Sequence, residues 1–151
     1  MIVYPNAKIN IGLNVLNKRE DGYHELSSVF YPVSELYDIL EIIISDDFSF
    51  SSSGIAIPGE NNICTKAFNL LKADYDVGNV KIHLHKMIPI GAGLGGGSAD
   101  GVFVLKALNE LFELNLTNHQ LEKYALKLGA DCPFFIENTP KYVTGIGEKM
   151  T

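Results

Sequence analysis

The sequence predicts an α+β domain built on a largely antiparallel sheet. Strand-like segments fill the first part of the 151-residue chain, and helices mixed with further strands follow. A parallel α/β fold would instead alternate strands and helices regularly. The composition suits one globular domain, because 46% of the residues are hydrophobic and 20% are charged.

Alternation of apolar and polar residues predicts the strands. Between residues 7 and 15 the odd-numbered positions are apolar, whereas Lys8 and the other even-numbered positions are polar or glycine. This pattern indicates a strand that buries its odd-numbered face. Turn signals at residues 18–22, 46–47 and 51–54 are interpreted as breaks between elements. The strands are expected at residues 7–15, about 25–34, about 37–45 and 80–84.

Helical periodicity and capping residues predict three helices. The first covers about residues 61–75, with Asn61 or Asn62 as its N-cap. The second begins near Ser98, runs to about residue 112 and turns an apolar stripe to the core. The third extends from a capping box at Thr117 to Leu128, and a glycine follows it. Two short strands are expected after it, at residues 134–136 and 141–144.

Charge and cysteine content exclude several classes of partner. The net charge of −6 makes attraction to nucleic acid a poor expectation. The N-terminal residues lack the basic and apolar regions of a signal peptide, and no apolar run is long enough to span a bilayer. Cys64 and Cys132 form no metal-ligand pattern and are expected to be buried, reduced thiols. We therefore expect a cytoplasmic protein without membrane contact.

A glycine-rich segment carries the sharpest chemical signal. Six glycines lie between positions 91 and 101, after a predicted strand and at the start of a predicted helix. Glycine lets main-chain N–H groups approach a ligand, and a helix N-terminus attracts anions, so the segment predicts a phosphate site. The Ser98 hydroxyl is placed to contact a phosphate or Mg²⁺. The expected phosphate-binding residues are Pro89, Ile90, Gly91, Ala92, Gly93, Leu94, Gly95, Gly96, Gly97, Ser98 and Ala99.

Three other interpretations of this segment fit the sequence less well. A flexible linker would have polar flanks, whereas patterned elements flank this one. Gly91, Gly93 and Gly96 match the dinucleotide-binding pattern G-x-G-x-x-G, but the preceding strand is half polar and no second strand ends in an acid about 20 residues on. A Walker A loop is excluded, since no Gly-Lys-Ser/Thr follows.

Four segments in order along the whole chain resemble the GHMP kinases, and within them the kinases of diphosphocytidyl-methylerythritol. Residues 89–98 resemble the phosphate motif. Ala7-Lys8-Ile9-Asn10-Ile11 resembles the opening strand, and Asp21-Gly-Tyr-His-Glu-Leu26 the substrate segment. Residues 128–135, Leu-Gly-Ala-Asp-Cys-Pro-Phe-Phe, resemble the segment with the catalytic aspartate.

The resemblance implies a fold and a reaction. The fold would be the GHMP kinase N-terminal domain, which is like domain 2 of ribosomal protein S5. The implied activity uses ATP and Mg²⁺ to phosphorylate a small molecule, methylerythritol linked to cytidine diphosphate. Family members are much longer, with a second domain, so residues 1–151 are expected to be the ATP-binding domain of a truncated form. In place of the family's Ser-Asn/Asp-Ala after the loop serine, the chain has Ala99, Asp100 and Gly101.

Residue roles follow from the same resemblance. Asp131 would be the base at the substrate hydroxyl and Lys8 its cationic partner, although generic residues of these types are solvated turn and strand residues. Lys86 and Asn62 would contact ATP, with helix capping an equal alternative for Asn62. No acidic Mg²⁺ ligand stands out. The expected substrate-binding residues are Asn10, Tyr23, His24 and Phe30, the last being equally suited to the core.

Two alternatives remain at this point. One is another GHMP kinase that acts on a sugar, mevalonate or homoserine. The segment from Asp21 to His24 argues against it, since an aromatic ring beside a histidine suits a cytidine base. The other is a fragment that binds nucleotide or a partner without catalysis.

Overall fold

The structure, a computed structural model, describes residues 1–59, 62–147 and 149–151. It is an α+β fold, as predicted, with two four-stranded sheets. The first sheet has the order β1 (Ile2–Val3), β4 (Ile39–Ile44), β6 (Val80–Lys86), β5 (Ser49–Gly54). The second has the order β2 (Asn6–Lys18), β3 (His24–Tyr37), β7 (Lys141–Gly145), β8 (Lys149–Met150).

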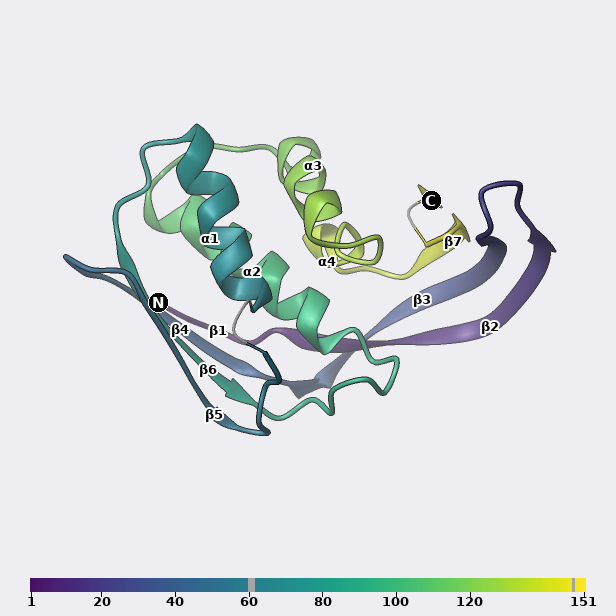
Figure 1. Ribbon diagram of the computed structural model, residues 1–151, viewed down its shortest axis with the longest axis horizontal. Helices are drawn as coiled ribbons and strands as arrows, with labels where there is room; N and C mark the ends of the chain where they lie inside the picture. Colours follow the sequence, from purple (N-terminus) through teal and green to yellow (C-terminus); the bar gives the residue numbers. More distant parts are fainter. Residues whose placement is uncertain (60–61, 148) are drawn as a thin grey trace.

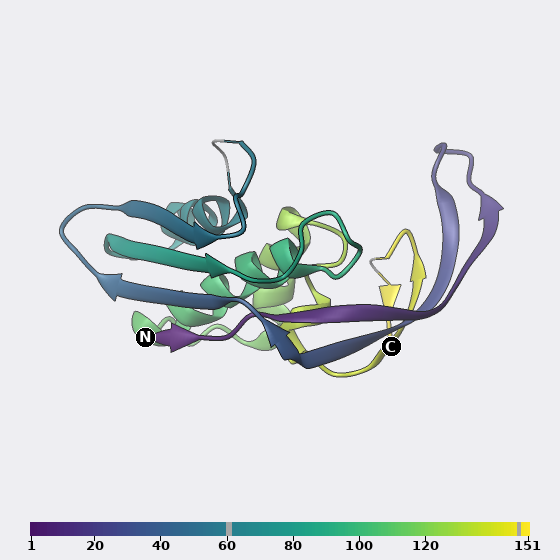
Figure 2. The same ribbon diagram turned by 90° about the horizontal axis from the view of Figure 1, so that it is seen from below.

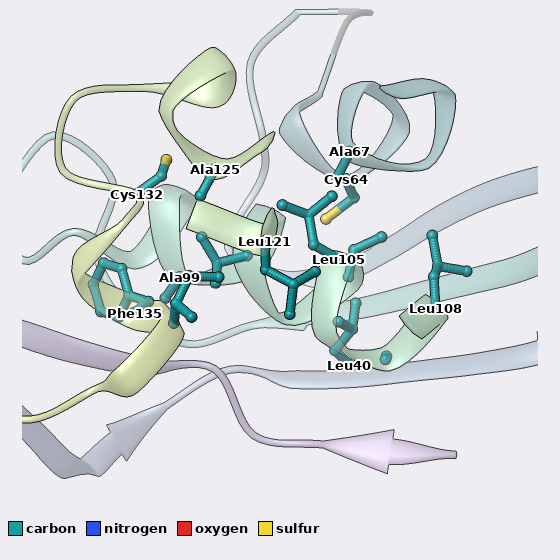
Figure 3. Packing of buried hydrophobic residues seen from close by; sticks show 14 of the residues in the cluster. Leu40, Cys64, Ala67, Ala99, Leu105, Leu108, Leu121, Ala125, Cys132 and Phe135 are labelled. Atoms are coloured by element: carbon teal, nitrogen blue, oxygen red, sulfur yellow. The ribbon is translucent and has the colours of Figure 1, made fainter. Parts of the chain in front are cut away.

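Helices cover one face of the first sheet (Figure 1). They are α1 (Ile63–Asp74), α2 (Gly96–Leu111) and α3 (Asn118–Leu128), with the short α4 (Phe134–Glu137) after them. Side chains from α1, α2, α3 and β4 meet in one core (Figure 3). Strand β6 contributes its alternate residues Val80, Ile82 and Leu84 to that core, as its pattern predicts.

Local capping residues begin α1 and α3, and end α3, where the sequence predicts, whereas α2 begins at Gly96, two residues before the predicted Ser98. The Asn62 side chain accepts a hydrogen bond from the Thr65 N–H at 2.9 Å and caps α1. Thr117 and Gln120 form a capping box at α3, and Gly129 is its C-cap. The alternative cap Asn61 lies outside the described residues. Both cysteines are free and buried, which confirms that prediction.

Strands β2 and β3 form an antiparallel arm that extends beyond the helices and curves at its far end (Figures 1 and 2). The strands were predicted, but the buried face of β2 was predicted wrongly. Ile9, Ile11, Leu13 and Val15 are 40%, 50%, 51% and 60% exposed, whereas Lys8 is 3% exposed. Most of the arm lies beyond the helices, and Lys8 is buried because it lies at the end of the arm next to them.

Two further predictions were wrong. Residues 134–136, predicted as a strand, form α4, which Asn138 ends in a left-handed conformation with a φ of 57°. All three side chains are buried, and a short apolar run does not distinguish a buried strand from a buried helix. Residues 51–54, interpreted as a break, belong to β5, which pairs in parallel with β6. None of the helices in the described ranges has the length and apolar character needed to cross a bilayer.

Candidate active site

The glycine loop joins the end of β6 to the start of α2, as predicted. Gly91, Gly93 and Gly95 have φ values of 72°, 74° and 69°, a region that other residues rarely adopt. Gly95 is the N-cap of α2, and no side chain caps this helix. The N–H groups of the first helical turn therefore point out of the helix unpaired, with the positive end of the helix dipole. This arrangement can hold an anion.

A cavity of about 440 Å³ lies against the loop. Its walls include the apolar side chains of Ile57, Ile63 and Leu84, whereas the loop itself supplies main-chain groups. Asn62 also lines this cavity while it caps α1. A cavity with apolar walls at one side and N–H donors at the other fits a molecule that combines a flat ring with phosphates.

The far end of the loop is bonded to β2. The Lys8 N–H donates to the Leu94 carbonyl at 2.8 Å, so Lys8 lies directly beside the loop. Its Nζ lies 3.6 Å from Asp131 Oδ2 and 4.2 Å from the centre of the Phe30 ring, and it donates to Asn10. Asp131 keeps 35% of its side chain exposed. The structure thus brings a buried cation and an accessible carboxylate together at one end of the loop.

A second glycine turn approaches the same carboxylate. A Cβ on Gly147 would lie 2.9 Å from Asp131 Oδ1, and its φ of 114° also disfavours other residues. Gly147 was not singled out from the sequence, although the pattern Gly145-Ile-Gly147 was a visible signal. The carboxylate is therefore in contact with main chain on one side, which leaves its exposed part for a ligand.

Lys86 lies in an environment that the sequence did not predict. Its Nζ lies 2.6 Å from Asp38 Oδ2 and 2.9 Å from Asp100 Oδ2, and all three residues are at most 3% exposed. Burial raises the pKa of Asp100, as does its hydrogen bond with Asp38, to about 8. The two carboxylates raise the pKa of Lys86 despite its burial. Both carboxylates already pair with the Lys86 ammonium. Contact between Lys86 and a nucleotide therefore stays a prediction.

Tyr23 and His24 lie near the tip of the arm, away from the loop. His24 is six residues beyond Phe30 along β3, about 20 Å at the usual rise per strand residue. Tyr23 is 61% exposed. Phe30 instead belongs to the core, where its ring contacts Phe134 edge-on. Among the described residues, no hydrogen bond or ion pair joins Tyr23 or His24 to Asp131.

Oxygen donors suited to Mg²⁺ lie near the end of the loop. Ser98 lines the cavity from the first turn of α2. Mg²⁺ prefers oxygen ligands and is often held by one or two protein groups together with phosphates and water. No cluster of three or more His, Cys, Asp or Glu side chains suited to a metal occurs in the described ranges. Such a site suits a Mg²⁺ ion that is held mainly by the phosphates of a nucleotide.

Known proteins share this sequence and this fold. A model of the GHMP kinase N-terminal domain matches residues 62–138, just over half of the chain. A 4-diphosphocytidyl-2-C-methyl-D-erythritol kinase of Parabacteroides distasonis is 51% identical over 99% of this chain and 56% of its own length. A Bacteroides fragilis protein of the same name is 54% identical over 97% of this chain. The chain thus spans about half the length of the curated relatives it matches.

Solved structures agree. The crystal structure of a 4-(cytidine 5'-diphospho)-2C-methyl-D-erythritol kinase superposes on the whole chain with a TM-score of 0.86 at 40% identity, and the chain covers 54% of it. A phosphomevalonate kinase from Streptococcus pneumoniae superposes with a TM-score of 0.68 at 16% identity, which shows the fold alone. From its family match, its relatives and its fold, the chain belongs to the GHMP kinases and carries their N-terminal domain.

Proposed function

We propose that this chain is the ATP-binding domain of a kinase that phosphorylates the 2-hydroxyl of 4-diphosphocytidyl-2-C-methyl-D-erythritol, a step of isoprenoid biosynthesis. The observation that carries the proposal is the position of the Lys8–Asp131 pair beside Leu94, at one end of the glycine loop. Phosphoryl transfer requires little more than alignment and charge stabilisation, which this arrangement supplies. Two buried free thiols suit the cytoplasm, where the reaction would take place.

ATP would lie with its base against the apolar wall of the cavity and its phosphates over the loop. The glycine N–H groups and the first turn of α2 would bind the phosphate oxygens. Bound Mg²⁺ would neutralise part of the phosphate charge, with Ser98 as the nearest hydroxyl on α2. The γ-phosphate would then face the end of the loop where Lys8 lies.

Asp131 would orient the substrate hydroxyl. The hydroxyl oxygen forms a bond to the γ-phosphorus while the bond from that phosphorus to the β,γ-bridging oxygen breaks, leaving ADP. The hydroxyl proton passes to the Asp131 carboxylate. The Lys8 ammonium, 3.6 Å away, stabilises the carboxylate before transfer and the phosphoryl oxygens during it.

The cytidine end of the substrate would lie toward Tyr23 and His24. A diphosphate-linked nucleoside is elongated, so separate contacts for its two ends are consistent with the distance along the arm. The names of the similar proteins support this substrate over a sugar, mevalonate or homoserine. Asn10, which accepts a hydrogen bond from Lys8, would contact the substrate near its reacting hydroxyl.

A second function has an observation in its favour. The glycine loop and the cavity beside it both lie within this domain, so the domain is also suited to bind nucleotide without turnover. Titration of the chain with Mg-ATP by calorimetry measures binding, and a phosphoryl-transfer assay with the diphosphocytidyl alcohol measures turnover. Binding without transfer would favour this second function.

One variant pair tests the role of Asp131. Asp131→Ala is expected to reduce transfer by about 10²–10⁴-fold, the usual contribution of a general base, with the ATP dissociation constant unchanged. Asp76→Ala removes an exposed carboxylate on the loop after α1 and should match the parent. Equal transfer by Asp131→Ala and the parent would refute the assigned role, and loss of ATP binding would indicate a structural role instead.

A further inference from the structure

The two carboxylate oxygens of Asp131 face different parts of the molecule. Lys8 Nζ lies 3.6 Å from Oδ2, whereas the main chain of Gly147 packs against Oδ1, where a Cβ would come within 2.9 Å. Gly147 is buried and ends a turn, which its N–H closes by donating to the Thr144 carbonyl at 3.3 Å. The position of this turn therefore limits the direction in which the carboxylate can point.

A side chain of the arm holds the turn at the point where β7 leads into it. Gly145, the last residue of β7, lies opposite Leu26 of β3, and its N–H donates to Glu25 Oε1 at 3.0 Å. Gly145 has a φ of 73°, so this bond is made where the chain leaves the regular sheet. A hydrogen bond to an ionised acceptor is roughly twice as strong as one between neutral groups.

The other oxygen of Glu25 faces the tip of the arm. Arg19 Nη1 lies 3.6 Å from Glu25 Oε2, and Arg19 Nη2 lies 3.1 Å from Asp21 Oδ2. The Arg19 N–H also closes the tip by donating to the Tyr23 carbonyl at 2.6 Å. The Arg19 and Glu25 side chains are 34% and 32% exposed, and ion pairs so accessible to water contribute little. The bond to Gly145 is therefore the stronger contact of Glu25.

We propose that Glu25 is a positioning residue of the transfer site: its carboxylate holds the turn of residues 144–147 against Asp131 and so fixes the direction in which Asp131 accepts the hydroxyl proton. The inference rests on the proposed function, which gives Asp131 that task. Glu25 follows directly on Tyr23 and His24. It thus connects the segment expected to hold the cytidine end of the substrate with the carboxylate expected to receive the proton.

Two substitutions separate the hydrogen bond of Glu25 from its charge. Glu25→Gln keeps an acceptor oxygen for the Gly145 N–H but loses the ion pair with Arg19, whereas Glu25→Ala loses both. The proposal requires that glutamine behave like the parent and that alanine not do so. Glu35→Ala is the matched control, because it removes an exposed glutamate at the other end of β3.

NMR of the ligand-free chain measures the positioning without any turnover. The side-chain carboxyl ¹³C signal of Asp131 and the amide signal of Gly147 should shift in Glu25→Ala and keep their parent positions in Glu25→Gln and Glu35→Ala. The Gly145 amide should exchange with solvent roughly tenfold faster in Glu25→Ala alone, as expected from the loss of one hydrogen bond. An unchanged Asp131 signal in Glu25→Ala would overturn the inference.

The phosphoryl-transfer assay then measures the consequence for the reaction. Glu25→Ala should lower kcat by about 10–100-fold with the KM for ATP unchanged, because a displacement of about 1 Å is enough for such a loss. Glu25→Gln should restore kcat. Equal losses in both variants would assign the effect to the charge and contradict the proposal. Absence of transfer by the parent would refute turnover by this chain, and the NMR comparison would then decide the role of Glu25 by itself.

Discussion

Strands β2 and β6 have the same alternating pattern but different surroundings. In β6 the apolar residues Val80, Ile82 and Leu84 are at most 1% exposed, because helices cover their side of the sheet. In β2 the apolar residues from Ile9 to Val15 are at least 40% exposed, since most of the arm extends beyond those helices. Alternation thus predicts a strand and its two faces, whereas burial depends on what packs against them.

The same division separates two kinds of candidate binding surface. The region around β6 and α2 offers main-chain groups and buried, mutually paired charges. The arm offers exposed side chains such as Tyr23 near its tip. Packing against the core holds the first kind of surface in place. The second kind consists of exposed side chains, whose contacts depend on what binds to the arm. Four predictions test this difference, from the largest expected effect to the smallest.

Truncating one apolar residue in each strand should give the largest contrast. Leu84→Ala leaves a cavity in the core and should lower the free energy of unfolding by about 2–5 kcal/mol. Ile11→Ala, at a position 50% exposed, should change it by less than about 0.5 kcal/mol. Urea unfolding of both variants measures the contrast. Similar costs for the two would mean that the arm face is covered in solution, which a dependence on protein concentration would reveal.

Stability should also depend on pH through the buried charges. The native state keeps the Asp100 proton up to about pH 8, whereas an unfolded aspartate releases it near pH 4, so stability should fall as the pH rises between these values. The slope is at most about 1.4 kcal/mol per pH unit. Asp38, whose pKa is lowered, contributes stability that is lost only at more acid pH.

Urea unfolding at pH 5.5, 7 and 8.5 measures this slope. Asp100→Asn should remove most of it, while Asp47→Asn on the exposed turn should leave it intact. If the parent instead gains stability from pH 5.5 to 8.5, Asp100 is ionised in the native state and the assignment of its proton is wrong.

Two adjacent glycines of α2 give a matched pair of smaller effects. An alanine at Gly96 would place its Cβ 2.8 Å from Ile88 Cγ2, and overpacking of this kind costs about 1–3 kcal/mol. At Gly97 nothing lies within 4 Å, so alanine should stabilise the helix by about 0.5–1 kcal/mol. Thermal unfolding distinguishes the two. Stabilisation by Gly96→Ala would show that the contact with Ile88 and Lys86 relaxes freely.

The smallest effect concerns Asn62, which both caps α1 and lines the cavity. Asn62→Ala should cost about 1 kcal/mol of stability through the lost cap, whereas Asn62→Ser should restore most of it, since serine also caps. Calorimetry with Mg-ATP then separates the two roles. We expect Asn62→Ser to bind like the parent, and a clear loss of affinity would assign Asn62 to the nucleotide.

Features encoded within a few residues could be predicted from the sequence. The caps at Asn62 and Thr117 and the turn at the glycine loop depend on neighbours in the chain, and the structure has them where expected. The approach of Lys8 to Asp131 came from resemblance, because no pattern relates residues 123 positions apart. The Asp38–Lys86–Asp100 cluster was missed for the same reason, since each member is unremarkable in its own segment.

The misassigned elements have a related cause. Serines 51–53 resemble a loop, yet β5 pairs through its main chain, and the Ser51 and Ser53 side chains hydrogen-bond His83 on the neighbouring strand. Phe134 to Ile136 have strand propensity, yet they are buried in the core, where they form a helical turn. In both cases tertiary contacts decide between conformations that local propensity leaves close in energy.

The glycines of the loop have an evolutionary consequence. Gly91 and Gly93 have open space around them but positive φ values, so the requirement at these positions is the path of the chain, and any other residue there would be strained. Adaptation toward a different nucleobase would have to act through the cavity wall, at positions such as Ile57 and Leu84. The ligand preference of such a domain could thus change while the glycine loop stays the same.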